Sequence, residues 1–227
     1  MEIAVDFEKD FPPDDGGFRL RMRFRSRSLR IVMHGPSGAG KSLLLKAIAG
    51  LIAPDRGRIA LGGRTFFDSA ARIDLRPQER RIAYVFQDYA LFPHLNVRQN
   101  IGFGLRRGLW NPSRRGQDER VGQWLRDFGL EGVAGQYPAQ LSGGQRQRTA
   151  LARALIAQPD ALLLDEPFAA FDPALRERLR GELMELQQRL TVPLLLITHD
   201  PEDVRLLGEH CLRIDNGAVA AEDGGDA

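Results

Sequence analysis

Four short apolar stretches each lead directly into a polar residue or a glycine. The stretches are 30–34, 81–86, 161–164 and 193–198, and the residues that follow them are Gly35, Gln87, Asp165 with Glu166, and His199. Continuous apolar runs without alternation are typical of strands covered on both faces, as in a parallel sheet. Helical patterns lie between them, so the pattern predicts an α/β fold. Because ligands bind beyond the carboxyl ends of such strands, we expect these polar residues to share one sheet edge.

A second kind of pattern predicts antiparallel strands beside this core. Residues 18–25 alternate apolar and Arg residues, which indicates a strand with one buried and one solvated face. The arginines also suit nucleic acid or lipid headgroups, but a solvated face, which also protects an edge strand, is the favoured interpretation. Residues 57–67 and 211–223 read as hairpins that turn at Gly62–Gly63 and Asn216–Gly217.

The segment from 88 to 160 is predicted to be helical. Asn96 is placed to cap one helix. In another, Val121, Trp124, Leu125 and Phe128 form an apolar stripe that ends before Gly129, and we interpret the stripe as core. We therefore expect one domain: residues 1–87 and 161–222 form the core with its antiparallel strands, 88–160 form an inserted helical subdomain, and 223–227 form a disordered tail.

Composition narrows the function classes only a little. The 227 residues carry a formal net charge of +2, which is too small to indicate nucleic-acid binding. The single cysteine, Cys211, excludes an internal disulfide. The first residues lack the basic and apolar regions of a signal peptide, and no apolar run approaches the ~18 residues that span a bilayer.

The first loop at the expected sheet edge carries a phosphate-binding motif. The sequence GPSGAGKS follows an apolar stretch, precedes a helical run, and matches the P-loop pattern; its residues are Gly35, Pro36, Ser37, Gly38, Ala39, Gly40, Lys41 and Ser42. In this motif the backbone N–H groups wrap the phosphates, Lys41 reaches the β- and γ-phosphates, and Ser42 binds Mg²⁺. The motif predicts a nucleoside triphosphatase.

The other strand ends supply the remaining chemistry. Asp165 is placed to hold Mg²⁺ through a water, and Glu166 beside it to orient or deprotonate the attacking water. A helix-capping acid before Pro167 is the alternative. Gln87 and His199 are weaker candidates on their own; next to a nucleotide they become candidates for sensing the γ-phosphate and Mg²⁺.

A second potential anion site lies in the sequence LSGGQRQR, at the start of a predicted helix running to about Ile156. Ser142 could simply be an N-cap, but two glycines after it suit the close approach of a bulky anion to the backbone. One nucleotide cannot occupy both this turn and the P-loop of one monomer. We therefore expect two chains to associate head to tail, with the Ser142–Gly144 turn of each closing over the nucleotide of the other.

In this order, the motifs resemble those of the ATP-binding-cassette (ABC) ATPases, and the resemblance covers essentially the whole chain. It implies two ATP molecules, with Mg²⁺, held between two such subunits. It further implies that Gln87 is the Q-loop glutamine and a Mg²⁺ ligand, Ser142 to Gln145 belong to the signature, Asp172 is the D-loop aspartate and His199 is the switch histidine. The family also stacks adenine on an aromatic residue near the N-terminus; Phe11 is our candidate, with Phe7 and Phe18 as rivals.

Within the family, residues 76–97 are most similar to importer ATPases for molybdate and related oxyanions. The resemblance implies a subunit peripheral on the cytoplasmic face of the cell membrane, bound to permease subunits and indirectly to a solute-binding protein, with no nucleic-acid partner. Transporters of sulfate, iron or polyamine, and a soluble ABC ATPase without a transport role, are alternatives. A coupling helix of the permease would dock near the cluster Tyr89, Leu91, Phe92 and Leu95, unless these side chains are buried within the helical subdomain.

Overall fold

The computed structural model describes residues 2–12, 17–105, 118–169, 171–190 and 192–224. Within these residues, one sheet contains eleven strands: β1 (Ile3–Asp10), β2 (Arg19–Ser26), β3 (Arg30–His34), β4 (Arg56–Leu61), β5 (Arg64–Asp68), β6 (Ile73–Asp74), β7 (Ile82–Val85), β8 (Ala161–Asp165), β9 (Leu194–Ile197), β10 (His210–Asp215) and β11 (Ala218–Asp223). The helices of the same residues are α1 (Lys41–Ala49), α2 (Pro77–Arg80), α3 (Val97–Phe103), α4 (Glu119–Asp127), α5 (Gly143–Leu155), α6 (Pro173–Leu190) and α7 (Pro201–Leu207), with 3₁₀ turns at Glu131–Val133 and Pro138–Gln140.

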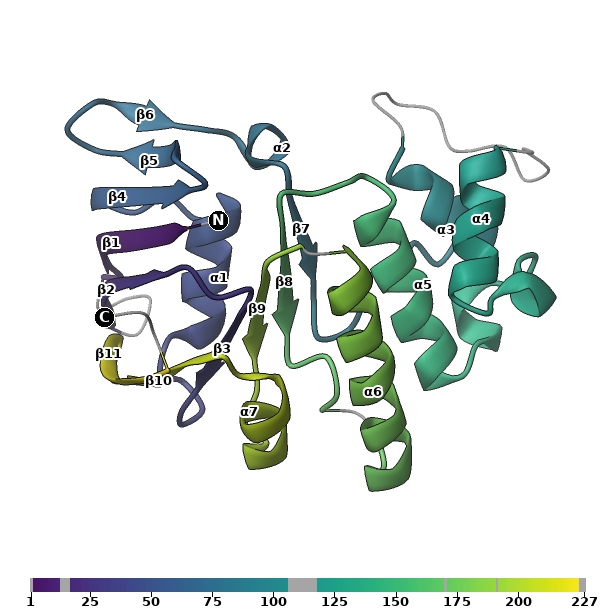
Figure 1. Cartoon of the computed structure of the whole chain (residues 1–227). Coiled ribbons are helices and arrows are strands. Elements are labelled where there is room, and N and C mark those ends of the chain that lie inside the picture. The colour runs from purple at the N-terminus through teal and green to yellow at the C-terminus, as the bar shows by residue number, and fades with distance from the viewer. Residues whose placement is uncertain (1, 13–16, 106–117, 170, 191, 225–227) are drawn as a thin grey trace.

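The four predicted core strands are confirmed. The order across the sheet is β6-β5-β4-β1-β2-β11-β10-β3-β9-β8-β7, and β3, β9, β8 and β7 pair in parallel (Figure 1). Alternate residues of these strands enter two separate apolar clusters. Leu162 and Leu164 of β8 pack with α5 and α6, whereas Ala161 and Leu163 pack with α1 and the antiparallel strands. Burial on both faces is the physical reason for the unbroken apolar runs.

The antiparallel strands belong to the same sheet as the parallel core. Both predicted hairpins are present, β4–β5 and β10–β11, and the turn residues have the positive φ angles that their Gly-Gly and Asn-Gly sequences suit: 57° and 80° at Gly62 and Gly63, 43° and 78° at Asn216 and Gly217. Parallel pairing of Ala218 with Arg21 joins β11 to β2. The two parts are therefore continuous, not merely adjacent.

The arginine row of β2 lies on the solvated face, as predicted, because the strand alternates exposed and buried residues. Each of three arginines has an acidic partner on the neighbouring strand β1: Arg19 with Asp10, Arg21 with Glu8 and Arg23 with Asp6. Such exposed pairs stabilise the fold little. They do compensate the positive charge of the row within the sheet itself.

The segment 88–160 contains α3, α4 and α5, which lie together beside the β7 edge (Figure 1). Asn96 caps α3, its side chain accepting the Gln99 N–H at 2.8 Å. On α4, Val121, Leu125 and Phe128 are buried and Trp124 packs against the same cluster, so the stripe is core. Residues 225–227 of the predicted tail lie outside the described residues, and Asp223, its first residue, is the last residue of β11.

The end of α1 depends on a buried arginine that the sequence did not reveal. Arg80 has no exposed surface, and its guanidinium donates to the carbonyls of Ala47 and Ile48 at 2.7 and 2.9 Å. These carbonyls are among the last of α1, where the helix supplies few partners; the Ala47 carbonyl also accepts the Gly50 N–H at 3.1 Å. In the described part of the chain, no helix has the length and apolarity needed to cross a bilayer.

Candidate functional site

The carboxyl ends of β3, β9, β8 and β7 lie along one edge of the sheet, as the sequence predicts (Figure 1). Asp165 ends β8 in register with Ile197 of β9, two residues before His199. The loop after β3 is the P-loop, which leads into α1. Residues separated by more than a hundred positions in the sequence therefore come together because their strands are parallel neighbours.

The P-loop, Gly35 to Ser42, is held in a conformation that only glycine tolerates at two points. Gly35 has a φ of 140°, and an added Cβ would lie 2.0 Å from the Ile214 carbonyl oxygen. Gly40 has a φ of 97°, and its Cβ would lie 2.5 Å from the side chain of Leu20. The loop is also tied to the last hairpin, since the Gly217 N–H donates to the Ala39 carbonyl at 3.1 Å.

Lys41 is the first residue of α1, and its ammonium group turns back over the P-loop. Its Nζ donates to the carbonyls of Gly35 and Pro36 at 2.9 and 2.7 Å, and the residue is only 6% exposed. Pro36, Ser37 and Gly38 at the tip of the loop are exposed. The loop thus exposes backbone to an anion and holds a cation against its own carbonyls.

Asp165 is oriented by two hydroxyl groups. Its Oδ1 accepts a hydrogen bond from Ser42 Oγ at 3.0 Å, and its Oδ2 accepts one from Tyr84 OH at 2.9 Å. Burial, followed by the charge of Asp165, raises the pKa of the Tyr84 phenol above its ordinary value. The phenol therefore keeps its proton and acts as a donor. Tyr84 was not predicted as a site residue because it lies within an apolar strand. Its phenol hydroxyl was the only feature of the sequence that could have indicated a role in the site.

Glu166 and His199 face each other at the ends of adjacent strands. His199 Nδ1 lies 3.3 Å from Glu166 Oε2, and their side chains are 59% and 24% exposed respectively. Glu166 has a φ of 47°, which is uncommon for a residue with a Cβ, while its N–H donates to the Ile197 carbonyl at 3.0 Å. Strained backbone of this kind is often found at functional sites. The pair offers a carboxylate beside an imidazole, both reachable from solvent.

Gln87 is exposed two residues after the end of β7, and the segment that follows it is anchored by hydrogen bonds. Tyr89 is buried and donates its hydroxyl to the Pro167 carbonyl at 3.1 Å, and burial raises the pKa of its phenol to about 12. Arg153 of α5 donates to the carbonyls of Tyr89 and Ala90. Of the four apolar residues considered for docking, Tyr89 and Leu95 are buried, so burial in the core is the correct interpretation for these two. The other two, Leu91 and Phe92, are half-buried.

The second potential anion site, the Ser142–Gly144 turn, lies at the start of α5. Ser142 is the N-cap, accepting the Gln145 N–H at 3.3 Å, and Gln145 Oε1 accepts the Ser142 N–H at 2.9 Å. This reciprocal pair is a capping box, so the plain structural role of both residues is present. Asp172 similarly accepts the Leu175 N–H at the start of α6. Binding of an anion by Ser142, Gly143, Gly144 and Gln145 remains a prediction.

The three aromatic candidates near the N-terminus differ in their surroundings. Phe7 is 1% exposed within the core, which removes it as a stacking platform for a ligand. Phe11 and Phe18 are neighbours, with ring centroids 6.5 Å apart. Phe18 also lies against the P-loop, because a Cβ added at Gly40 would come within 3.1 Å of its ring. Adenine stacking on Phe11 stays a prediction, with Phe18 as its remaining rival.

A family model with the description ABC transporter matches residues 22–169 of this sequence. The chain belongs to the ABC transporter family. The match includes the P-loop, Gln87, the Ser142–Gln145 turn and Glu166. Asp172 and His199 lie beyond it; the contact with Glu166 places His199 at the sheet edge, whereas the role of Asp172 stays a prediction.

The sequence relatives of this ABC transporter chain include import ATP-binding proteins. The sulfate/thiosulfate import ATP-binding protein of Synechocystis is 46% identical over 83% of this chain and 51% of its own length. The molybdenum import ATP-binding protein of Paramagnetospirillum magneticum is 41% identical over 91% and 56%. The molybdate/tungstate import ATP-binding protein of Archaeoglobus fulgidus is 43% identical over 90% and 81%. The chain therefore spans about half the length of the first two.

The solved structures similar to this chain are also ATP-binding cassettes of ABC proteins. A dimeric cassette in a post-hydrolysis state, bound to ADP and Pi, is 28% identical and superposes with a TM-score of 0.79 over 98% of both chains. A second cassette, in an ADP conformation, has a TM-score of 0.82 at 24% identity over 99% of this chain and 91% of its own, and shows the shared fold alone.

Proposed function

We propose that this chain is the ATP-hydrolysing subunit of an importer for molybdate or a related oxyanion. The observation that carries the proposal is the group of side chains at one sheet edge: Lys41 in the P-loop, Asp165 hydrogen-bonded to Ser42, and Glu166 against His199. This is the set that phosphoryl transfer to water requires: a phosphate cradle, a metal-binding pair and a base. In the proposed reaction, Lys41 binds the β- and γ-phosphates and Glu166 takes the proton of the attacking water.

The residues around Ser42 fit Mg²⁺. The ion prefers hard oxygen ligands and retains several waters, and the site offers the Ser42 hydroxyl and the Asp165 carboxylate 3.0 Å apart. Ser42 and Asp165 would hold the ion, with Gln87 as a further candidate ligand. When bound, Mg²⁺ neutralises the charge that develops on the phosphate oxygens. The role of Tyr84 is to fix the Asp165 carboxylate through Oδ2 while Oδ1 faces Ser42.

Tyr84→Phe tests this arrangement. The variant keeps the ring and removes the hydroxyl, so the Asp165 carboxylate loses one charge-assisted donor. We expect the Mg²⁺ concentration that half-saturates nucleotide binding to rise by about tenfold, because such a hydrogen bond is worth about 1.5–3 kcal/mol. Equilibrium binding of ATP in EDTA serves as the internal control and should not change. An unaltered Mg²⁺ dependence would show that Tyr84 has no part in the metal site.

A second copy of this chain is the proposed partner at the nucleotide. The P-loop and the Ser142–Gly144 turn lie on different elements, β3–α1 and α5. In the head-to-tail dimer, the turn of one chain approaches the γ-phosphate bound by the other, so that the positive end of helix α5 faces an anion. The dimeric cassettes among the similar solved structures support this arrangement.

A groove beside the β7 edge is the proposed docking site for the membrane subunit. It encloses about 740 Å³ between β7, α2 and the helices α4 and α5, and Arg81, Trp124 and Arg153 are among its lining residues. Arg153 also holds the carbonyls of Tyr89 and Ala90, so an occupant of the groove can act on the segment that follows Gln87. In this proposal the chain is a peripheral subunit on the cytoplasmic face of the membrane.

The test is to purify the tagged chain in mild detergent from its native membranes and to identify the proteins that accompany it by mass spectrometry. A polytopic permease in equal amount is the expected result. The associated solute-binding protein would then be titrated with molybdate and with sulfate to determine which of the two it binds. If it binds neither, iron and polyamine are the solutes to test next. Recovery with ribosomes, DNA or only soluble proteins would favour the soluble, non-transport ATPase.

A further inference from the structure

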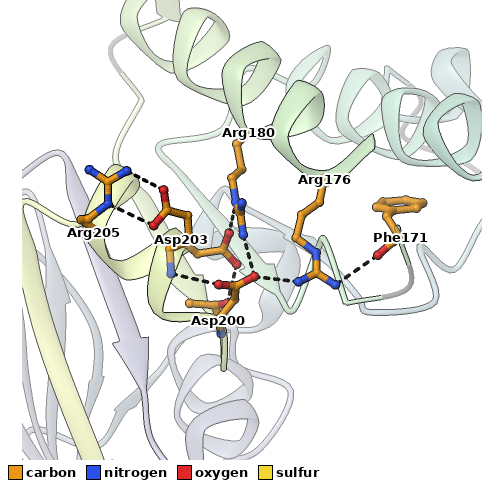
Figure 2. Close-up of polar contacts among 8 residues, drawn as sticks. Phe171, Arg176, Arg180, Asp200, Asp203 and Arg205 are labelled. Carbon is orange, nitrogen blue, oxygen red and sulfur yellow. Dashed lines mark hydrogen bonds and ion pairs between the residues drawn. The ribbon is translucent and has the colours of Figure 1, made fainter. Parts of the chain in front are cut away.

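Two arginines of α6 contact the segment that carries His199. Figure 2 shows Arg176 and Arg180 directed toward Asp200 and Asp203. Arg176 Nη1 donates to Asp200 Oδ2 at 2.7 Å, and Arg180 Nη2 donates to the same oxygen at 2.6 Å. Arg180 also pairs with Asp203 through its Nε. One carboxylate oxygen thus receives both guanidinium groups immediately after His199.

The cluster is largely removed from water and balanced in charge. The side chains of Arg180 and Asp203 are 8% and 3% exposed, those of Arg176 and Asp200 24% and 18%. Burial alone would raise the pKa of Asp200, but hydrogen bonds from the Glu202 N–H and the Arg176 guanidinium outweigh it and hold that pKa below its ordinary value. Asp200 is therefore charged throughout the neutral range and attracts both guanidinium groups.

The same contacts fix the backbone on either side of His199. The Asp200 N–H donates to Thr198 Oγ1 at 3.0 Å, and the Thr198 hydroxyl donates to Asp203. Both neighbours of His199 are thus anchored, while the imidazole itself is exposed and faces Glu166. The position of Asp200 consequently determines where the imidazole lies.

The second terminal nitrogen of the Arg176 guanidinium contacts a different part of the chain, at Phe171. Its Nη2 donates to the Phe171 carbonyl at 3.1 Å. The Phe171 ring covers Gly143 so closely that an added Cβ there would lie 2.5 Å from it. The ring also stacks on Tyr89, with centroids 6.3 Å apart and planes 12° from parallel. Phe171 therefore touches both the Ser142–Gly144 turn and the segment after Gln87.

We propose that Arg176 is a positioning residue that couples the Ser142–Gly144 turn to His199. The inference rests on the proposed function, in which this turn closes over the nucleotide of the partner subunit. Closure moves Phe171 with the turn, and the fork of Arg176 transmits that movement to Asp200 and so to His199 at the chain's own nucleotide. One guanidinium group can bind both the Asp200 carboxylate and the Phe171 carbonyl because its donors are held in a rigid plane. An ammonium group would reach only one of these two acceptors. The two ATP sites of a dimer are thereby linked.

Arg176→Gln tests the coupling, with Arg178→Gln as the matched control on the same helix. Arg178 is 68% exposed, and within the described residues its ion pair is with Glu182 of the same helix. For Arg176→Gln we expect a roughly tenfold lower kcat, since small misplacement of a group near the reacting atoms is costly, and a KM for ATP within about threefold of wild type. The Hill coefficient for ATP should fall from near 2 to about 1, because loss of the link uncouples the sites. Arg178→Gln should match the wild type in kcat, in KM for ATP and in the Hill coefficient.

The variants also separate failure of the coupling from failure of the fold or of the function. Arg176→Lys retains a cation for Asp200 and should stay folded by its thermal unfolding midpoint, yet should show the same lowered kcat and Hill coefficient; it decides the matter if Arg176→Gln does not fold. Full cooperativity and kcat in Arg176→Lys would overturn the inference. A wild-type protein that hydrolyses no ATP would instead overturn the proposed function.

Discussion

Glu166→Gln is expected to stop steady-state ATP hydrolysis while preserving ATP binding. Glutamine has nearly the same size and can accept a contact from His199, but its amide cannot take a proton from water. We expect hydrolysis to fall by about 100-fold or more, the range for loss of a general base. If hydrolysis reopens the proposed dimer, its loss should let ATP drive the variant into a stable dimer. Phosphate release, equilibrium nucleotide binding and gel filtration with and without ATP measure the three properties.

Glu131→Gln provides the control, because Glu131 is an exposed carboxylate in a 3₁₀ turn outside the sheet edge. It should hydrolyse ATP as the wild type does. Hydrolysis by Glu166→Gln within about twofold of wild type would contradict the role of Glu166 as base, given that such a role is worth at least about 100-fold. The base would then have to be sought among the other groups at the sheet edge, His199 first.

Lys41→Ala is expected to lose most of its affinity for ATP. The Lys41 ammonium is nearly buried, and both of its protein partners are carbonyls of the P-loop itself. Its charge is therefore available to phosphate oxygens and is not neutralised by a carboxylate among these partners. Truncating one member of a buried, charged hydrogen-bonded pair costs about 2–5 kcal/mol, so we expect affinity to fall by about 100-fold.

Lys46→Ala is the matched control. Lys46 lies in the last turn of the same helix α1, more than one helical turn away from the P-loop. Isothermal titration with ATP and Mg²⁺ compares the two variants, and thermal unfolding verifies that both are folded. ATP should no longer induce dimers of Lys41→Ala. Equal affinities for the wild type and Lys41→Ala would remove the P-loop assignment, and with it the ATPase.

The parts of this fold that could be predicted from sequence are those encoded locally. Strands covered on both faces give unbroken apolar runs, and the Gly62–Gly63 and Asn216–Gly217 turns give hairpins because their residues tolerate positive φ. The position of the site at one sheet edge could be predicted because, in α/β folds, ligands bind beyond the carboxyl ends of the parallel strands. The P-loop and the carboxylates of Asp165 and Glu166 could be predicted because each lies where one of these apolar strands ends.

Contacts between distant residues could not be predicted. The pairing of Tyr84 with Asp165 joins residues 81 positions apart, and the Arg80 bonds to the end of α1 join residues more than 30 apart. Nothing in the local sequence marks Arg176 as different from Arg178, since both lie on a helix rich in charge; only its packing against Asp200 does. Burial of Tyr89 likewise depends on how α5 packs against the segment after Gln87, which a local pattern does not specify.

The attachment of the P-loop to the last hairpin has a consequence for biosynthesis. The loop follows the third strand, yet Gly35 lies against Ile214 and Ala39 is bound by Gly217. A ribosome synthesises the chain from its N-terminus, so the P-loop emerges long before the residues that hold it in shape. During synthesis, β3 lacks its neighbours β9 and β10, and non-local pairing of this kind forms slowly. The nascent chain therefore cannot complete its nucleotide cradle until residues 210–217 have been translated, and it gains the ability to bind nucleotide only after that point.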